Sequence, residues 1–121
     1  FIGSPPMNFL EGGVEGGTSL VLDSGVRLTL PVAVSSDSRL TIGVRPEHLT
    51  LADNGWAANV SVVEPTGSET QITARIAGNL VRVLVRGRTD VQPGDTIYLN
   101  VLPKDLHVFD TRTGKRQEVG L

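Results

Sequence analysis

Residues 72–86 read ITARIAGNLVRVLVR, and this stretch decides the fold. Within it, residues 72–76 and again residues 81–85 place an apolar side chain at every second position. Side chains of a β-strand point to opposite faces in turn, so this period of two predicts two half-buried strands. Residues 77–79, Ala-Gly-Asn, separate them, and Gly and Asn readily adopt the positive φ of a tight turn. The stretch therefore predicts a β-hairpin.

The same period of two recurs along the rest of the chain. Apolar residues stand at every second position in 26–30, 40–44 and 97–101. Val60 and Val62 belong to a further predicted strand that runs to Glu64. Each of these runs is as long as an ordinary strand.

Turn and helix signals agree with an all-β chain. Residues 23–25 and 93–95 combine Gly with Asp, Ser or Pro, as tight turns do. No helical period of apolar residues persists over three turns, and only Pro46-Glu47-His48-Leu49 is expected to form one helical turn, because Pro is favoured at the first helical position. Many short strands with almost no helix predict an all-β barrel or sandwich with less than about a tenth helix.

Length and composition place the chain among ordinary globular domains. It has 121 residues, of which 39% are hydrophobic and 20% charged, and its net charge is −2. No apolar run approaches the ~20 residues that span a bilayer, and the chain lacks the Lys and Arg surplus of a non-specific nucleic-acid binder. The absence of cysteine suits a cytoplasmic protein. Because Phe1 is not an initiator, we expect the reading frame to start upstream.

Residues that could support catalysis or bind a metal are few. His48 and His107 are far apart in sequence and no cysteine accompanies them, so we expect two unrelated histidines rather than a zinc site. The carboxylates of Glu47, Glu64 and Glu69 could form an acid–base pair, but solvated or salt-bridged roles are the expectation. No Gly-x-Ser-x-Gly nucleophile elbow is present. The sequence predicts that this chain is not an enzyme and holds no metal or cofactor.

One short motif resembles the end of a phosphate-binding loop. Thr113-Gly114-Lys115 has the right order, but Arg116 stands where Ser or Thr would reach magnesium, and Phe109 stands where the first Gly is needed. We therefore expect residues 110–114 to form a turn, and no ATP or magnesium site in this chain.

Small β-barrels often bind single-stranded nucleic acid through aromatic residues in a basic groove. Aromatic residues are scarce here, and Trp56 is expected in a loop after Asn54-Gly55. Arg82, Arg86 and Arg88 form one basic cluster, which an exposed strand face explains equally well. We expect no nucleic-acid partner.

Separated motifs resemble those of one known family. Residues 1–10, FIGSPPMNFL, resemble the junction at which ATPase subunits of the maltose and glycerol-3-phosphate transporter type leave their nucleotide-binding domain. Residues 42–49, IGVRPEHL, resemble the family's internal signature. Residues 62–70, VVEPTGSET, resemble the next motif, with Thr66 where leucine is commoner. The segments PGD at 93–95 and LHVFD at 106–110 resemble the family's closing strands.

The resemblance implies that residues 1–121 form the C-terminal regulatory TOBE/OB-type domain of a sugar ABC-transporter ATP-binding subunit. It implies an all-β fold of small OB-type or MOP-like barrels with at most a one-turn helix. It also implies a homodimer through this domain and contact with the membrane subunits through an upstream ATPase domain, which would hold ATP and magnesium. A regulatory protein is a further implied partner. The implied location is cytoplasmic, peripheral on the inner face of the cell membrane, without direct membrane insertion.

The family's motifs also suggest interface or structural residues. They are Arg45, Pro46, Glu47, His48, Glu64, Gly67 and Glu69. Pro46 holds the preceding residues extended, and Arg45 can pair with a carboxylate, so the two make a rigid corner. This corner either stabilises the fold alone or also fixes the surface that meets a partner subunit. We expect Arg45, Glu47 and Glu69 near a two-fold contact.

An oxyanion-binding module is the alternative function, because related barrels in molybdate systems bind oxyanions at subunit interfaces. Such sites use backbone amides with Ser, Thr or Lys side chains. Ser35-Ser36-Asp37-Ser38 and Thr66-Gly67-Ser68 could supply these groups, and each is equally a plain loop.

Overall fold

The computed structural model describes residues 6–34, 39–114 and 119–120, and strands dominate these residues. The strands are β1 (Asn8–Glu15), β2 (Ser19–Leu22), β3 (Arg27–Thr29), β4 (Ala33–Val34), β5 (Leu40–Val44), β6 (Thr50–Ala52), β7 (Trp56–Pro65), β8 (Glu69–Ile76), β9 (Asn79–Arg86), β10 (Thr96–Asn100), β11 (His107–Asp110) and β12 (Val119–Gly120). Within the described residues, helix is confined to two 3-10 turns, η1 (Pro46–His48) and η2 (Pro103–Asp105). The predicted all-β class is confirmed.

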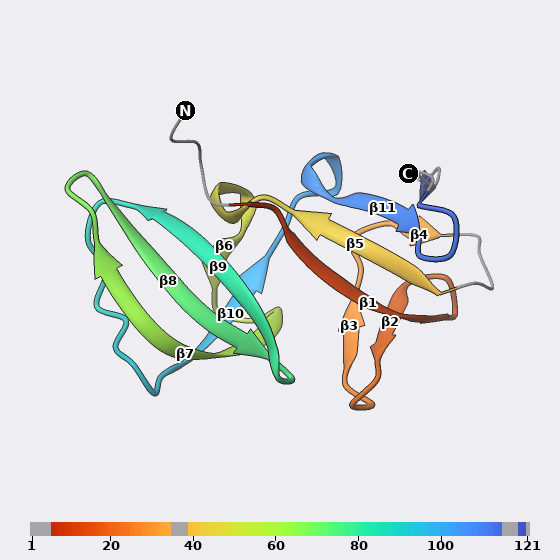
Figure 1. The fold of residues 1–121 in the computed structure, drawn as a ribbon, viewed down its shortest axis with the longest axis horizontal. Helices are drawn as coiled ribbons and strands as arrows, with labels where there is room; N and C mark the ends of the chain where they lie inside the picture. Colours follow the sequence, from red (N-terminus) through yellow and green to blue (C-terminus); the bar gives the residue numbers. More distant parts are fainter. Residues whose placement is uncertain (1–5, 35–38, 115–118, 121) are drawn as a thin grey trace.

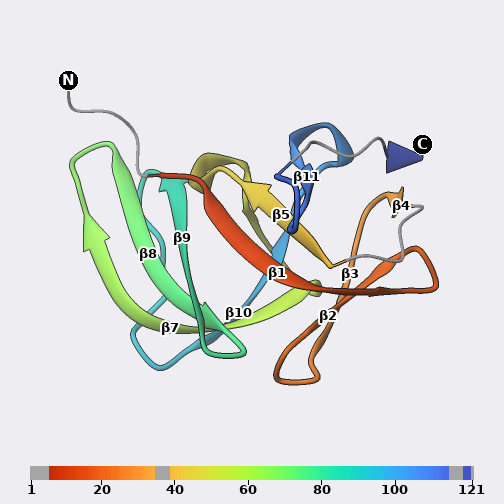
Figure 2. The ribbon, with the colours of Figure 1, turned by 45° about the vertical axis from the view of Figure 1, so that its right-hand side comes forward.

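Two curled antiparallel sheets of five strands lie side by side (Figures 1 and 2). The first, which we call sheet I, has the order β11-β5-β1-β2-β3, and the second, sheet II, has the order β6-β10-β7-β8-β9. A third, two-stranded sheet pairs β12 with β4. Because β11 returns from the far end of the chain to pair with β5, the two sheets are interlocked rather than sequential.

The chain crosses between the sheets twice, and each crossing is a proline turn. It leaves sheet I after β5 through η1, and it returns from β10 through η2 into β11. In both turns an extended residue, Arg45 or Leu102, precedes the proline, as steric contact with the proline ring favours. The helical turn predicted at 46–49 is confirmed. The turn η2 was not predicted, although Pro103-Lys104-Asp105-Leu106 repeats the Pro-x-x-Leu spacing of the first.

The strands bury the alternating apolar side chains that the sequence predicts. In β5, Leu40, Ile42 and Val44 are all buried. The same alternation is buried in residues 72–76 and in residues 97–101. Buried residues from both sheets form one hydrophobic core, so each sheet stabilises the other.

Two residues depart from the predicted alternation. Val62 is 44% exposed, because a β-bulge between Val60 and Val62 shifts the register of β7 against β8 and turns the later residues to the other face. Val26 is 43% exposed because it closes the β2–β3 turn, where its carbonyl accepts the N–H of Leu22 at 2.9 Å. The strand β3 begins one residue later.

Two side chains fasten sheet I to sheet II. Asn8 of β1 donates through Nδ2 to the carbonyl of Arg82 at 2.7 Å and accepts the Arg82 N–H at 2.8 Å, so its amide acts as a backbone partner for the edge strand β9. Trp56 donates through Nε1 to the carbonyl of Thr29 at 2.9 Å. The prediction that Trp56 lies in a loop is wrong: it is buried and opens β7, because this contact draws the indole into the junction.

Candidate functional site

A groove on sheet II collects several of the residues that the sequence analysis named. It has a volume of about 350 Å³. Its lining is Glu47, Leu49, Thr50, Leu51, Glu69, Leu84, Val85 and Arg86. The groove therefore brings together Glu47 and Glu69, which come from different motifs of the sequence.

The groove lies where sheet II does not close. Its lining residues come from η1 and β6 on one side and from β8 and β9 on the other. Both β6 and β9 end the strand order of sheet II, so each has a strand neighbour on one side only. Edge strands keep main-chain groups available for a partner, and here they flank a hollow with leucine walls and charged rims.

The charges of the groove do not neutralise one another. Glu69 stands directly across from Arg86 in the β8–β9 register, and Glu47 belongs to the exposed side of η1. In the described part of the chain, no ion pair involves any of these three side chains. A surface with unpaired carboxylates beside an unpaired guanidinium can match a copy of itself, because the guanidinium of each copy can meet a carboxylate of the other across a two-fold axis.

The corner residues before and within η1 have separate surroundings. Pro46 is buried, whereas Arg45 is exposed and pairs with no carboxylate in the described residues, so the pairing considered for it does not form within the chain. His48 is half-buried, and its Nδ1 lies 3.7 Å from Oδ1 of Asp105 in η2. His48 and Asp105 thus lie close together at the two crossings without a hydrogen bond from Nδ1, and this proximity was not predicted.

The remaining predicted residues lie at the β7–β8 turn. Glu64 is exposed near the end of β7, and Gly67 has a φ of 82°, a left-handed conformation that favours glycine. Thr66 donates both its N–H and its hydroxyl to the carbonyl of Glu69, and the carbonyl of Ser68 accepts the Gly87 N–H at 2.7 Å. The Thr66-Gly67-Ser68 loop therefore uses several of its polar groups internally. The second candidate loop, Ser35–Ser38, lies outside the described residues.

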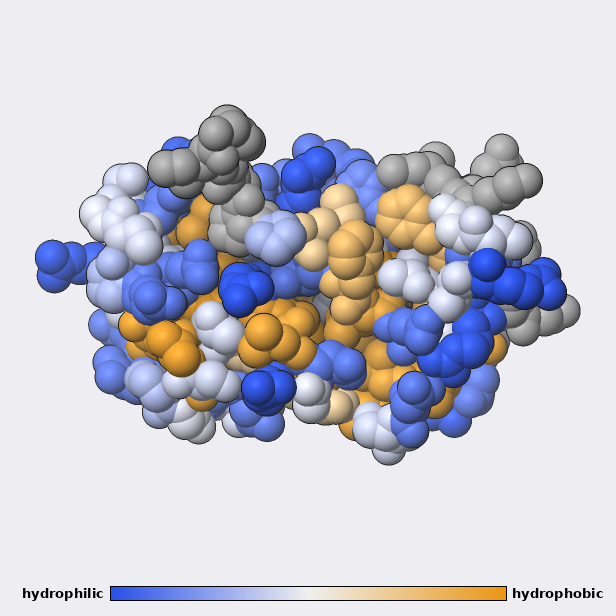
Figure 3. All heavy atoms as spheres, viewed as in Figure 1, coloured by the Kyte–Doolittle hydropathy of each residue, from blue (hydrophilic) through white to orange (hydrophobic). Residues whose placement is uncertain are grey.

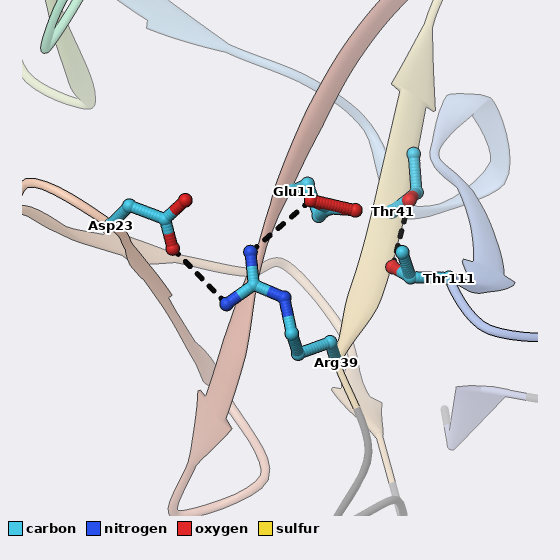
Figure 4. Close-up of polar contacts among 5 residues, drawn as sticks. All are labelled: Glu11, Asp23, Arg39, Thr41 and Thr111. Atoms are coloured by element: carbon cyan, nitrogen blue, oxygen red, sulfur yellow. Dashed lines mark hydrogen bonds and ion pairs between the residues drawn. The ribbon is translucent and has the colours of Figure 1, made fainter.

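A polar cluster on sheet I was not predicted (Figure 4). Arg39 reaches Glu11 of β1 at 3.2 Å and Asp23 of the β2–β3 turn at 3.0 Å. The hydrogen bond to Glu11, followed by the interaction with Asp23, raises the pKa of Arg39 above its ordinary value. Nearby, the hydroxyls of Thr41 and Thr111 are 2.9 Å apart. These contacts tie strands together and leave the arginine no unpaired charge.

The end of the chain contains the phosphate-loop lookalike. The Asp110 carboxylate accepts the N–H groups of Arg112 and Thr113 at 2.9 and 3.1 Å, and the Gly114 N–H reaches the Asp110 carbonyl at 2.7 Å. The predicted turn over 110–114 is confirmed. Lys115 and Arg116, which completed the motif, lie outside the described residues.

A second hollow, of about 540 Å³, lies between β3, the start of β7 and the end of β10. Arg27 is its one charged lining residue, and it is paired with Glu15 at 2.7 Å. Across the described ranges, no three His, Asp or Glu side chains come together as a metal site, and no helix is long and apolar enough to cross a membrane.

Two family profiles match the chain in succession. The profile described as the MalK OB fold domain matches residues 3–49, and the profile of the TOBE domain matches residues 42–109. The first covers the strands from β1 to β5. The second covers sheet II and most of the returning strand β11.

Curated relatives match nearly the whole chain. The uncharacterized ABC transporter ATP-binding protein y4oS of Sinorhizobium fredii is 42% identical over 120 residues, which are 96% of this chain and 32% of that protein. The sn-glycerol-3-phosphate import ATP-binding protein UgpC of Ruegeria sp. is 36% identical over 119 residues, which are 96% of this chain and 33% of that protein. The chain thus spans about a third of the length of these relatives.

A solved structure shares the fold. It is that of the cytoplasmic molybdate-binding protein ModG with molybdate bound, with a TM-score of 0.65 and 15% sequence identity. The match covers 84% of this chain and 94% of that chain. At this identity the likeness concerns the fold alone, and it agrees with the OB-type and MOP-like barrels expected from the sequence.

Proposed function

The chain belongs to the TOBE domain family, and from that premise we propose that it is the regulatory and dimerisation domain of the ATP-binding subunit of an ABC importer for sugars or related solutes. The observation that carries this proposal is the match of 96% of the chain to ATP-binding proteins of ABC transporters, UgpC among them. The proposed subunit works in the cytoplasm on the inner face of the membrane.

Under this proposal the chemistry of ATP lies outside the chain. The upstream part of the subunit holds ATP and magnesium and contacts the membrane subunits, while this domain holds two subunits together and receives a regulatory protein. The role is therefore mechanical: the domain keeps two ATPase units at a high effective concentration through their cycle. A purified 121-residue chain is expected to show no ATP turnover.

The groove on sheet II supports a two-fold contact. Its unpaired Glu47, Glu69 and Arg86 offer charges that a second copy can complement, and its Leu51 is 37% exposed. A standard protein interface buries roughly 1,600 Å² in total, and this groove with its surroundings offers less when the ATPase units are absent. We therefore expect self-association of micromolar or weaker affinity.

Sedimentation equilibrium of the 121-residue chain tests the proposal. We expect a reversible monomer–dimer equilibrium, weakened by Glu47→Arg together with Glu69→Arg because each change places like charges across the axis. Asp90→Arg is the matched control, since Asp90 is an exposed carboxylate that does not line the groove. A chain that remains a strict monomer at millimolar concentration would falsify the dimerisation role.

A small oxyanion-binding module is the second candidate function. The fold shared with the ModG structure favours it. A ligand that binds the folded state alone must raise the melting temperature, so molybdate and sulfate titrations followed by thermal unfolding separate the two functions. We expect no shift with either anion if the domain is purely a dimerisation module.

A further inference from the structure

The β8–β9 hairpin is the most basic part of the chain. Residues 70–88 contain Arg75, Arg82, Arg86 and Arg88 and no Asp or Glu, although the chain as a whole has a net charge of −2. The one carboxylate of the hairpin is that of Glu69, the first residue of β8, which faces Arg86 at the groove end, and the other twelve lie elsewhere. Three of these arginines, Arg82, Arg86 and Arg88, form the basic cluster that an exposed strand face was expected to explain.

The hairpin separates its residues cleanly between two faces. In the β8–β9 register, buried Ala74 faces buried Val81, whereas Arg75 faces Leu80 and Thr73 faces Arg82 on the outer side. Along β9 the outer positions run Leu80, Arg82, Leu84, Arg86, a strip roughly 20 Å long at the ordinary rise of a strand. Over β8 and β9, Figure 3 shows strongly hydrophilic residues beside hydrophobic ones.

These arginines have no carboxylate partners. Among the described residues, the ion pairs of arginine involve Arg27 and Arg39 only. Arg75 donates to the carbonyl of Gly78 at 3.2 Å, which leaves its charge uncompensated. Leu80, across from Arg75, is 43% exposed. The hairpin thus presents unpaired cations and an exposed leucine on one surface.

We propose that the outer face of the β8–β9 hairpin outside the groove, where Arg75, Leu80 and Arg82 lie, is a docking surface for an acidic protein segment in which carboxylates and apolar side chains alternate along the face that it presents. Charge complementarity identifies the occupant, because unpaired guanidiniums bind carboxylates bidentately and steer an acidic partner to the surface. Leu80 stands across from Arg75 and two residues before Arg82, so it meets an apolar side chain of an extended segment that presents acidic and apolar side chains in turn along one face.

A protein segment fits this face better than an extended polyanion does. A bilayer or a nucleic acid meets the whole molecule, and the net negative charge of the chain opposes it. The curled hairpin (Figure 2) offers a flat bilayer only part of its length. A short acidic segment contacts the hairpin alone and avoids the carboxylates elsewhere.

Arg75 and Arg82 test the proposal without disturbing the proposed dimer groove, which neither lines. Because Asn8 bonds the main chain of Arg82, Arg82→Gln preserves that link between the sheets. The probe is an acetylated peptide of about eight residues, one strand length, with the repeat Glu-Ser-Val-Ser, so that acidic and apolar side chains alternate along one face of the extended peptide. The matched peptide has Lys in place of Glu. Binding is followed by the amide resonances of the isotope-labelled 121-residue chain.

We expect the Glu peptide, and not the Lys peptide, to shift the resonances of β8 and β9. The combination of Arg75→Gln with Arg82→Gln should raise its Kd about three- to tenfold, the effect of losing two exposed ion pairs. Arg112→Gln, an exposed arginine away from the hairpin, should leave the Kd unchanged. The proposal is overturned if the double variant binds the peptide equally well, if the peptide does not bind, or if phosphatidylglycerol vesicles bind the hairpin and the peptide does not.

Discussion

The indole of Trp56 donates its N–H to the carbonyl of Thr29 across 2.9 Å, and this bond joins the first residue of β7 to the edge strand β3. The indole is 5% exposed, so its ring also fills the junction between the two sheets. The bond is part-buried, so its loss costs free energy, because water replaces the donor only in part. The junction therefore depends on tryptophan and not on aromaticity alone.

Replacement of Trp56 tests this dependence. Trp56→Phe keeps an aromatic ring but removes the donor and part of the buried area, so the free energy of unfolding should fall by about 1–3 kcal/mol. Urea denaturation followed by circular dichroism measures it. Tyr98→Phe is the control, since Tyr98 is 40% exposed and should change the stability by less than about 0.5 kcal/mol. Equal stability of the two variants would contradict the expected role of the bond.

Asn8 supports the second prediction. Its amide both donates to and accepts from the main chain of Arg82, so Asn8→Ala should lower the free energy of unfolding by about 1–3 kcal/mol. Asn8→Asp keeps the acceptor and loses the donor, and it should be destabilised as well. Asn59→Ala removes an exposed contact of 3.2 Å with Thr96 and should cost less than about 0.5 kcal/mol. A urea midpoint that is lower for Asn59→Ala than for both Asn8 variants would contradict the expected role of Asn8.

Much of this fold could be predicted from sequence because its signals are local. The alternation of apolar and polar side chains within 40–44, 72–76 and 97–101 predicted the strands and their buried faces. The residues Ala77-Gly78 predicted the hairpin turn. The failures are not local. Val62 faces outward because of a bulge that only pairing with β8 reveals, and Trp56 is buried by a bond to a residue 27 positions away.

The candidate site likewise has features that local sequence predicts and features that depend on tertiary structure. The motifs named Glu47 and Glu69 separately, but only the packing of η1 against β9 of sheet II places them on one groove. The contact of His48 with Asp105 depends on the two crossings lying together, which no pattern within either turn specifies. Local motifs identified the residues, and tertiary structure decided which of them meet.

Gly55 supports a prediction about close backbone approach. It has a φ of 140°, and a Cβ built there would collide with the carbonyl of Leu99 and the side chain of Asn100. Gly55→Ala should therefore lower the free energy of unfolding by about 2–3 kcal/mol, from backbone strain and overpacking together. Gly94→Ala is the matched control, since Gly94 has a φ of 95° but open space around it. Thermal unfolding should place Gly94→Ala between the wild type and Gly55→Ala, and the opposite order would count against the collision.

The Arg39 cluster gives a prediction about pH and salt. Hydrogen bonds to Glu11 and then to Asp23 raise the pKa of Arg39 in the folded state. Because the pKa is raised on folding, the contacts of Arg39 contribute their full stability at every pH below the pKa of the unfolded state. That stability is lost only as the pH rises through the pKa of the folded state, which for arginine lies far above neutrality. The difference in stability between wild type and Arg39→Gln should therefore be constant from about pH 6 to pH 9. Because the three side chains are exposed to solvent, the same difference should shrink at about 1 M salt. Urea midpoints at several pH values and two salt concentrations measure both effects, and a difference that vanishes by pH 9 would show that another group controls it.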